Sequence, residues 1–241
     1  MVKEKRAIVI GASSGIGREL AMRLSRDGWV VGLAARRRTM LEDIQRELPL
    51  SSFVQVMDIA RDDEVEDAFN DLTARIGGAD LVVISAGTGY LNPELDWEKE
   101  RATIEVNIKG FAAVANAAMK HFLARGAGHL AGISSVAGVR GNGTAPAYSA
   151  SKAFVSNYLE GLRCAAKKSG ADITVTDIVP GYVDTEMAKG EGLFWVASPE
   201  TAARQIVRAL IRKKPRVYVT RRWALVAMVL RHLPGWMLAR F

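Results

Sequence analysis

The sequence predicts an α/β protein in which a doubly wound parallel sheet of about seven strands carries helices on both faces. Short apolar runs alternate with helical patterns along the chain, and the runs are almost continuous in apolar residues. Such runs are typical of parallel strands that are covered on both faces. A length of 241 residues, of which 49% are hydrophobic, suits one domain with a sizeable core.

The first half of the chain contains three strand–helix pairs and a fourth strand. The first helix closes on Gly28, the second stops before Pro49, and the third has an acidic first turn and ends at Gly77 and Gly78. We expect strands within residues 6–14, 29–36, 52–59 and 79–87, and helices within 17–28, 38–48 and 62–78.

The second half continues the alternation. Ser198 is placed as a helix cap, with Pro199 at the first helical position. We expect helices within 101–126, from about 145 to 169, and within 198–213, and strands within 128–138, 173–181 and 216–220. No repeat or Pro/Ser/Gly linker divides the chain, so we expect one domain over residues 1–220 and a basic, apolar helical extension over 221–241.

The positive charge is confined to the C-terminal part of the chain. The formal net charge is +7, yet residues 201–241 contain ten Lys and Arg and no acid. Residues 1–200 hold the remaining 23 bases and all 26 acids, which gives a charge of −3. The body of the protein is therefore not basic. We expect no nucleic-acid partner and a local basic feature instead.

The compartment is predicted from the cysteine and from the apolar runs. The single cysteine, Cys164, has no partner for an internal disulfide, and we expect a small buried side chain in a reducing compartment. Glycine soon breaks the apolar run after the basic N-terminus, so this run is a first strand and not a signal peptide. No window offers about 20 uninterrupted apolar residues. We expect a cytoplasmic protein.

The turn "GASSGIG" lies between the first strand and the first helix. Gly11, Gly15 and Gly17 allow a tight turn and let phosphate oxygens approach the free amides of the helix N-terminus. The spacing differs from the commoner G-x-G-x-x-G fingerprint, and many strand–helix turns need glycine for geometry alone. At the first junction of a doubly wound chain, the turn favours nucleotide binding.

The end of the second strand carries three consecutive arginines and no acid. An acid there would accept hydrogen bonds from a ribose 2′-hydroxyl, whereas a base would pair with a 2′-phosphate. The residues are Arg36, Arg37 and Arg38, of which Arg36 is the best candidate for the phosphate, and Ser14 is placed to add a hydroxyl. The pattern favours NADP(H) over NAD(H). The alternative is a solvated arginine run that opens a helix.

Tyr148 and Lys152 stand four residues apart in the expected helix "APAYSASKAF". Side chains at this spacing leave the same helix face one turn apart. A free phenol has a pKa of about 10, and a nearby ammonium favours the phenolate and lowers that pKa. The pair is either a catalytic acid with the ammonium that adjusts its pKa, or two exposed side chains that are neighbours by chance.

With these motifs the chain resembles the short-chain dehydrogenases/reductases over roughly residues 5–220. The resemblance rests on "GASSGIG", on Ser85-Ala86-Gly87 as a variant of an N-N-A-G segment, and on "EVNIKG", "ISSVAG", "YSASK" and "PGYVDT". It implies a Rossmann-like fold and hydride transfer between a nicotinamide and a carbonyl or secondary alcohol.

The resemblance also implies a catalytic set of Asn107, Ser135, Tyr148 and Lys152. Tyr148 would be the general acid in reduction and the base in oxidation, with a pKa lowered by Lys152 and by the positive nicotinamide of the oxidised complex. Lys152 would also hold the nicotinamide ribose. Ser135 would donate to the carbonyl oxygen, and Asn107 would hold a water on a proton path.

The cofactor contacts that the resemblance implies follow the same motifs. Asp58 would contact the adenine, although a cap on the next helix explains it equally well, and Thr185 would bind the nicotinamide carboxamide. Ile10 and Ile84 depart from the family pattern and loosen the polar network beneath the cofactor loop. No His/Cys cluster has metal-ligand spacing, so no metal is expected. The full set is Gly11, Ser13, Ser14, Gly15, Ile16, Gly17, Arg36, Arg37, Asp58, Ile59, Ser85, Ala86, Gly87, Tyr148, Lys152, Pro180, Gly181, Val183 and Thr185.

The substrate would lie against Ser135 and Tyr148. Four further residues are placed to surround its carbonyl group, with Leu91 and Leu193 beside them. Side chains of this kind favour an apolar substrate, with ordinary packing under a loop as the alternative. The four are Tyr90, Met187, Phe194 and Trp195.

The tail from Arg221 to Phe241 extends past the common family core. Two arginines and Trp223 precede about eight apolar residues, and Trp236 follows after an interruption. The segment is too short to cross a bilayer but has the basic and aromatic residues of a helix at an anionic membrane surface. The alternatives are packing on a neighbouring subunit or over the substrate pocket.

The predicted function is therefore an NADPH-dependent carbonyl reductase that acts on a small, apolar molecule as a homodimer or homotetramer. Two alternatives stay open. One is a non-catalytic NADP(H)-binding sensor or scaffold. The other is an NAD-dependent alcohol dehydrogenase of the same fold.

Overall fold

Strands and helices alternate along the part of the chain that the structure, a computed structural model, describes, which is residues 4–187 and 193–234. The strands are β1 (Lys5–Ile10), β2 (Trp29–Ala35), β3 (Ser52–Val56), β4 (Leu81–Ile84), β5 (Ala127–Ile133), β6 (Asp172–Pro180) and β7 (Arg216–Val219). The helices are α1 (Gly15–Arg26), α2 (Arg38–Glu47), α3 (Asp62–Arg75), α4 (Trp97–Ile104), α5 (Phe111–Arg125), α6 (Pro146–Ser169), α7 (Pro199–Ile211) and α8 (Trp223–His232). A π turn, η1 (Glu105–Gly110), joins α4 to α5, and a 3-10 turn, η2 (Val136–Val139), follows β5.

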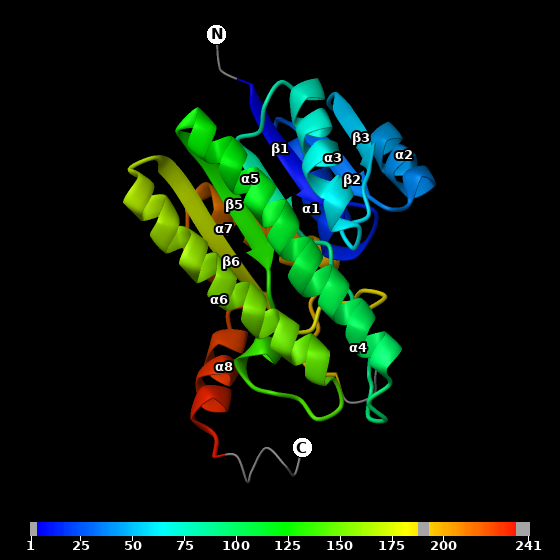
Figure 1. Cartoon of the computed structure of the whole chain (residues 1–241), viewed down its shortest axis with the longest axis vertical. Coiled ribbons are helices and arrows are strands. Elements are labelled where there is room, and N and C mark those ends of the chain that lie inside the picture. The colour runs from blue at the N-terminus through cyan, green and yellow to red at the C-terminus, as the bar shows by residue number, and fades with distance from the viewer. Residues whose placement is uncertain (1–3, 188–192, 235–241) are drawn as a thin grey trace.

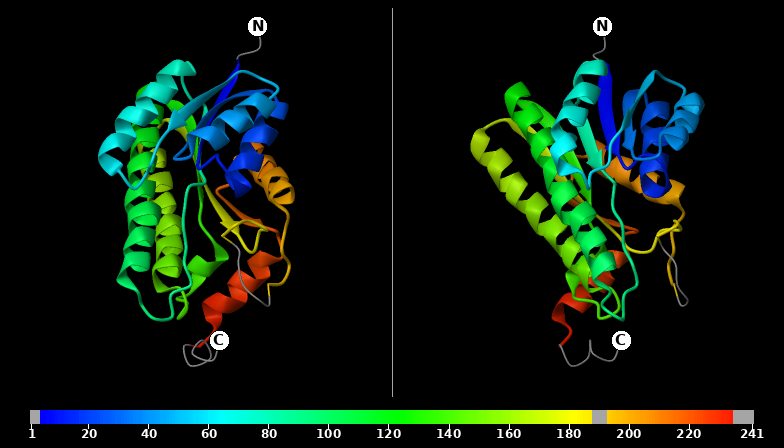
Figure 2. Two further views of the ribbon diagram at one scale, coloured as in Figure 1. Left: turned by 90° about the vertical axis from the view of Figure 1, so that its right-hand side faces the viewer. Right: turned by 45° about the vertical axis from the view of Figure 1, so that its right-hand side comes forward.

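The strands form one parallel sheet in the order β3-β2-β1-β4-β5-β6-β7. The chain winds outward from β1 to β3, returns past β1 to β4, and continues to the other edge at β7. Helices cover both faces of the sheet (Figures 1 and 2). The predicted fold class is confirmed, and the reversal between β1 and β4 marks the place where such sheets bind ligands.

The alternation of side chains along β1 divides the core in two. Ala7 and Val9 pack with α1, α2 and α7, while Ile8 and Ile10 pack with α3, α5 and α6. Burial on both faces explains why the strand reads as a continuous apolar run. Cys164 does not belong to the core. The prediction that it is buried is wrong, because it lies on the solvent side of α6.

The predicted continuous helix over 101–126 is wrong, because η1 interrupts it. Gly110, at the end of η1, packs so closely on the segment after β3 that a Cβ there would overlap the carbonyl oxygen of Ile59. The wide turn places the buried Asn107 beside the segment after β4, where it binds the backbone of Thr88. π turns within helices are frequent at functional sites.

The described part of the C-terminal extension, residues 221–234, packs on the domain. α8 lies below the sheet in Figure 1, beyond the carboxyl ends of β5 and β6. Trp223, in its first turn, is 4% exposed and packs with Val136 of η2 and Val179 of β6. Among the helices of the described residues, none is long and apolar enough to cross a bilayer.

Candidate active site

The predicted site residues meet at the carboxyl edge of the sheet. The glycine turn follows β1, residues 85–89 follow β4, Ser135 follows β5, and Pro180 ends β6. Parallel strands all end at the same edge, so these segments gather there although up to about 170 residues separate them in sequence. α6 adds Tyr148 and Lys152 from the side.

The glycine turn forms a cradle that side chains would fill. Gly11 has a φ of 87°, and a Cβ at this position would overlap the backbone of Ala86. A Cβ at Gly17 would overlap the carbonyl oxygen of Gly11. Gly15 opens α1 with a φ of 55°. A turn without side chains at the N-terminus of a helix fits the phosphates of a dinucleotide.

Arg37 is the arginine that the structure brings to this turn. Its guanidinium donates to the hydroxyl oxygens of Ser13 at 2.9 Å and Ser14 at 2.7 Å. Arg36, the residue favoured from the sequence, is exposed, and Arg38 pairs with Glu42 at 3.6 Å. A cation and two hydroxyls thus gather at the end of β2.

The paired helix residues lie as their spacing predicts. The Lys152 Nζ atom lies 5.7 Å from the ring centre of Tyr148 and donates to the carbonyl oxygen of Ile133 at 3.1 Å. Ser135 lies close enough to the Tyr148 hydroxyl to lower the pKa of the phenol through side-chain hydrogen bonding. The ring is enclosed on another side by Gly89, where a Cβ would lie 2.5 Å from Cδ2 of Tyr148. Ser135, Tyr148 and Lys152 form one contiguous group.

The pKa values of this group depart from expectation. Burial lowers the pKa of Lys152 to about 8, and the charge of Asp177 opposes that shift. Burial raises the pKa of Tyr148, while its hydrogen bond with Ser135 lowers it and the charge of Tyr182 raises it. The expected lowering by Lys152 is therefore not seen in the protein alone. The ammonium is directed at the Ile133 carbonyl, and the phenol loses more from desolvation than it gains.

Asn107 reaches the site from η1. Its Oδ1 accepts from the Thr88 amide at 2.8 Å, and its Nδ2 donates to the Thr88 carbonyl at 2.7 Å and to Ser151 Oγ at 3.0 Å. A Cβ at Gly87 would lie 3.2 Å from Asn107 Oδ1 and 3.3 Å from Lys152 Nζ. The two side chains thus converge on Gly87 from opposite elements, and the proton path through Asn107 stays a prediction.

Asp177 was missed by the sequence reasoning. It is fully buried in β6, where its carboxylate accepts from Ser134 Oγ at 2.6 Å and from Arg216 Nε at 2.9 Å. Ser134 directly precedes Ser135, so the carboxylate lies beneath the catalytic set. The available signal was an acid in the middle of the apolar run "TVTDIVP", because a buried charge needs partners.

The remaining residues predicted to bind the cofactor make different kinds of contact in the structure. Asp58 accepts from the backbone amide of Ala60 at 3.1 Å, which closes a local turn before α3 and does not cap that helix. The Thr185 methyl carbon would lie 3.1 Å from a Cβ at Gly15. Ile59 and Val183 are buried, and Ser85 donates its amide to the Ile10 carbonyl at 2.8 Å.

The expected substrate residues divide into two groups. Phe194 stacks on Trp223 with ring centres 5.2 Å apart, and Trp195 lies edge-on to Phe194 at 5.5 Å. Tyr182, which the sequence reasoning did not single out, contacts Trp223 at 5.3 Å. We call Tyr182, Phe194, Trp195 and Trp223 the aromatic cluster. Tyr90 and Met187 are exposed and are not part of it. Residues 188–192 and 235–241 are not among the described residues.

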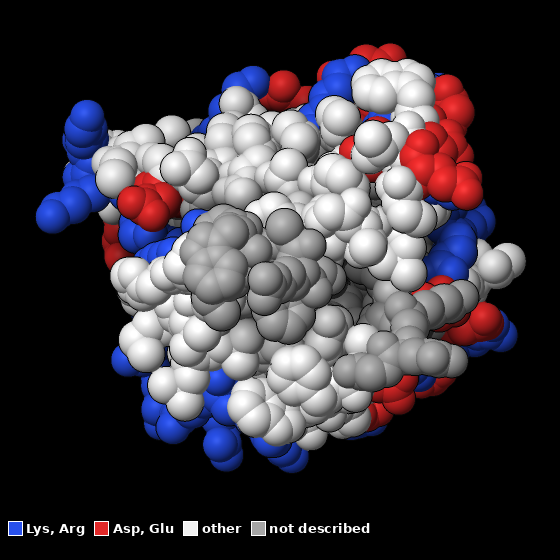
Figure 3. All heavy atoms as spheres, turned by 90° about the horizontal axis from the view of Figure 1, so that it is seen from below, with Lys and Arg blue, Asp and Glu red and all other residues white. Residues whose placement is uncertain are grey.

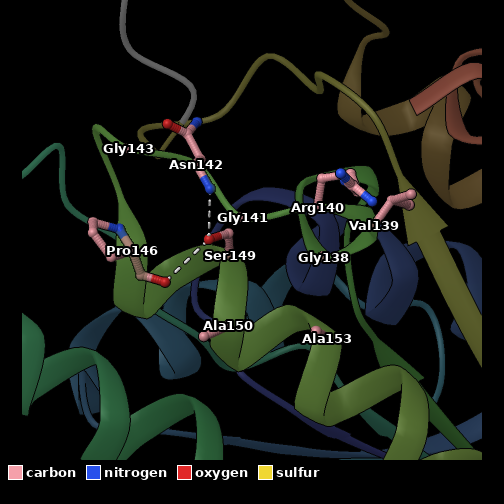
Figure 4. A pocket seen from close by; sticks show the side chains of 10 residues that line it. All are labelled: Gly138, Val139, Arg140, Gly141, Asn142, Gly143, Pro146, Ser149, Ala150 and Ala153. Atoms are coloured by element: carbon pink, nitrogen blue, oxygen red, sulfur yellow. Dashed lines mark hydrogen bonds between the residues drawn. The ribbon is translucent and has the colours of Figure 1, made fainter. Parts of the chain in front are cut away.

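The first turns of α6 are held by the segment before it (Figure 4). Ser149 Oγ accepts from the Asn142 amide at 3.1 Å and donates to the Pro146 carbonyl at 3.0 Å. A Cβ at Gly138 would lie 2.6 Å from the backbone of α6. A hollow of about 560 Å³ lies between this segment and the helix. The contacts fix the turn of α6 that carries Tyr148.

Comparison with known proteins shows the family of the chain. A model of the short chain dehydrogenase family matches residues 5–193. An uncharacterized oxidoreductase of Myxococcus xanthus is 40% identical over 186 residues, which cover 75% of this chain and 73% of the relative. An uncharacterized oxidoreductase of Mycobacterium tuberculosis is 34% identical over 251 aligned positions, which cover 100% of this chain and 98% of the relative. An alcohol dehydrogenase of Thermococcus sibiricus, solved with 5-hydroxy-NADP, has a TM-score of 0.79 and 26% identity, with 90% of this chain and 96% of the other covered.

The fold and the site define an oxidoreductase that binds a nicotinamide cofactor in a doubly wound sheet. The chain belongs to the short chain dehydrogenase family.

Proposed function

We propose that the protein is an NADPH-dependent reductase of a carbonyl group on an apolar substrate, with Tyr148 as the proton donor. The proposal rests chiefly on the proximity of Tyr148 to Ser135 and to the buried Lys152, whose Nζ atom lies 5.7 Å from the ring centre of Tyr148. These groups can polarise and protonate one oxygen atom. A sensor or scaffold has no need of such an arrangement.

The chain's own residues supply the proton and hold the oxygen, while the bound cofactor supplies the hydride. The raised pKa of Tyr148 keeps the phenol protonated at neutral pH, which suits an acid in reduction. Ser135 Oγ accepts from the Ala137 amide at 3.1 Å and lies 3.5 Å from the Pro180 carbonyl, a long hydrogen bond that its hydroxyl can exchange for the substrate oxygen. Lys152 keeps a positive charge next to the phenolate that forms.

The preference for NADPH is proposed from Arg37, Ser13 and Ser14. A guanidinium that already contacts two hydroxyls at the end of β2 makes a site for a 2′-phosphate, and the end of β2 carries no acid of its own. The exposed Glu186 also pairs with this guanidinium, at 3.9 Å, and a phosphate would have to replace it. The Thermococcus sibiricus relative was solved with an NADP derivative, and a more distant dehydrogenase of Sphingobium yanoikuyae with NADPH. Both agree with this preference.

The apolar substrate is proposed from the aromatic cluster. Phe194 is 49% exposed and Trp195 is 44% exposed, and both lie beyond the carboxyl end of β6, where the nicotinamide pocket is expected. The buried Trp223 supports them from α8. Aromatic side chains at the mouth of a pocket bind apolar groups. A homodimer or homotetramer remains a prediction, which light scattering of the purified chain would test.

The decisive experiment is a screen of aldehydes, ketones and 3-oxoacyl thioesters with NADPH and with NADH. We expect carbonyl-dependent loss of NADPH absorbance that disappears in Tyr148→Phe. Binding of NADPH without turnover of any carbonyl would support a sensor. Faster turnover with NADH or NAD would support the NAD-dependent alternative.

A further inference from the structure

A groove of about 880 Å³ runs between α7, β7 and the first turn of α8. Seven of the 14 residues that line it are Lys or Arg, and none is Asp or Glu. Within the described residues, only Arg216 of the seven pairs with a carboxylate, that of Asp177. The groove therefore contains most of the positive charge that the sequence assigns to residues 201–241.

The α7 wall of the groove carries like charges that repel one another. Arg204, Arg208 and Arg212 are spaced four residues apart and are all exposed, so their guanidinium groups line one face of the helix. Like charges at this spacing destabilise a helix. The helix dipole favours Arg208 and Arg212 near the C-terminus of α7, but the repulsion between neighbouring arginines remains, and an anion in the groove would turn it into attraction.

The groove continues into an apolar stripe on α8. Arg221, just before α8, and Ala224, in its first turn, line the groove. Leu225 and Met228 stand three residues apart on the same face of α8. Leu225 is 62% exposed and Met228 is 56% exposed, whereas Trp223 and Ala227 face the domain. In Figure 3, uncharged side chains make up much of the described surface at this end of the molecule, and Lys and Arg lie around its edges, including a group at the lower left.

We infer that the basic groove and the outer face of α8 together bind the surface of an anionic phospholipid membrane. Lipid phosphates would lie against the arginines of α7, while Leu225 and Met228 enter the boundary between headgroups and acyl chains. A row of cations beside a row of apolar side chains is complementary to a lipid surface. Residues 221–234 are too few to span the bilayer.

Two other occupants fit this surface less well. A phosphodiester backbone matches the arginines but leaves Leu225 and Met228 without an apolar partner. A second copy of the chain, related by a two-fold axis through this surface, would place the arginine rows against each other or against the partner's apolar stripe, and neither arrangement neutralises the arginines. The inference does not depend on the proposed reaction, since membrane binding needs no turnover.

The test is co-sedimentation of the full chain with vesicles of phosphatidylcholine alone and of phosphatidylcholine with about one third phosphatidylglycerol. We expect binding to the anionic vesicles only, and weaker binding as salt rises. Arg208→Gln with Arg212→Gln should weaken partition about 30-fold, because each base contributes a factor of about five at such a surface. Leu225→Ser with Met228→Ser should weaken it while the salt dependence remains.

The matched control is Lys167→Gln with Lys168→Gln, which removes the same charge from exposed positions at the end of α6. This pair should bind as the wild type does, and thermal unfolding should show that every variant is folded. Equal binding to neutral vesicles, or an equal loss in the control pair, would overturn the inference. So would displacement by inorganic phosphate at constant ionic strength, which indicates a free-phosphate site, or a change of oligomeric state in the α8 variant, which indicates a subunit interface. Even if a variant fails to fold, the inference is tested by the wild type alone, which should bind anionic but not neutral vesicles and should bind them less at high salt.

Discussion

The Nζ atom of Lys152 lies 5.7 Å from the centre of the Tyr148 ring and is hydrogen-bonded to the carbonyl oxygen of Ile133 at 3.1 Å. Because Ile133 ends β5 and Tyr148 begins α6, this one ammonium group connects the edge of the sheet to the proton donor. Its charge is maintained in a site that lowers its pKa to about 8. The catalytic proposal therefore depends on how that charge is preserved.

Replacing Tyr148 by Phe should reduce kcat for carbonyl reduction by about 10²- to 10⁴-fold, the usual contribution of general acid catalysis. The ring and its contact with Gly89 remain, so unfolding temperature and NADPH binding should not change. Steady-state rates with NADPH fluorescence titration would check this. Retained turnover would show that another group donates the proton.

The pKa of Lys152 predicts two pH effects. Reduction should decline as the pH rises through about 8, because the ammonium that stabilises the developing phenolate is lost. In the same range stability should rise, because the folded state binds fewer protons than the unfolded state between about 8 and the ordinary value of 10.5. Lys152→Met should therefore stabilise the protein by about 1–3 kcal/mol at pH 7 and by less at pH 10. Urea unfolding at both pH values measures it, and a gain that is equal at both would contradict the assigned pKa.

Asp177 should act as a positioning residue for Lys152. In Asp177→Asn the opposing charge is lost, so the pKa of Lys152 should fall further and the alkaline decline in rate should move to lower pH. Stability should fall by about 3 kcal/mol, because the Arg216 guanidinium loses its buried partner. The control is Asp172→Asn, which removes an exposed aspartate of the same strand. A purely structural role for Asp177 would lower stability and leave the pH profile unchanged.

Steady-state kinetics can show which arginine at the end of β2 binds NADPH. Arg37→Gln should raise KM for NADPH about 10- to 100-fold and leave KM for NADH unchanged, since a charge-assisted hydrogen bond to a phosphate is lost. Arg38→Gln is the control, because that side chain pairs with Glu42. If Arg36→Gln has the larger effect, the sequence-based choice was correct and the contact of Arg37 with Ser13 and Ser14 is structural.

Trp223 should determine both stability and substrate binding. A Cβ at Gly181 would overlap the indole, and Phe194 stacks on its other side. Trp223→Ala should destabilise the fold by about 3–5 kcal/mol, as for other buried aromatics. Trp223→Phe should keep most of that stability and change KM for apolar carbonyls more than KM for NADPH. Trp97→Ala, at a position that is 62% exposed, is the control. If KM for the carbonyl substrate is unchanged in Trp223→Phe, α8 does not form part of the substrate pocket.

Local sequence patterns were sufficient for the strand–helix alternation and for the Tyr148–Lys152 pair, because both depend on neighbours within one or two turns. Other features depend on contacts between distant segments. Arg37 rather than Arg36 contacts Ser13 and Ser14 because of the direction in which the chain leaves β2, and η1 accompanies the close approach of Gly110 to Ile59. The raised pKa of Tyr148 reflects burial that no short motif encodes. Tyr182 and Trp223 join one cluster only because α8 folds back on β6.

The match to the family model ends at residue 193, whereas Trp223 and the arginines of α7 lie after that point. The nucleotide half and the proton donor are thus encoded in one continuous stretch, and the groups proposed to select the substrate and the cellular surface are encoded mostly in the last fifty or so residues. Exchanging that terminal segment between related chains should alter what is reduced, and where, while the chemistry of hydride transfer is inherited intact.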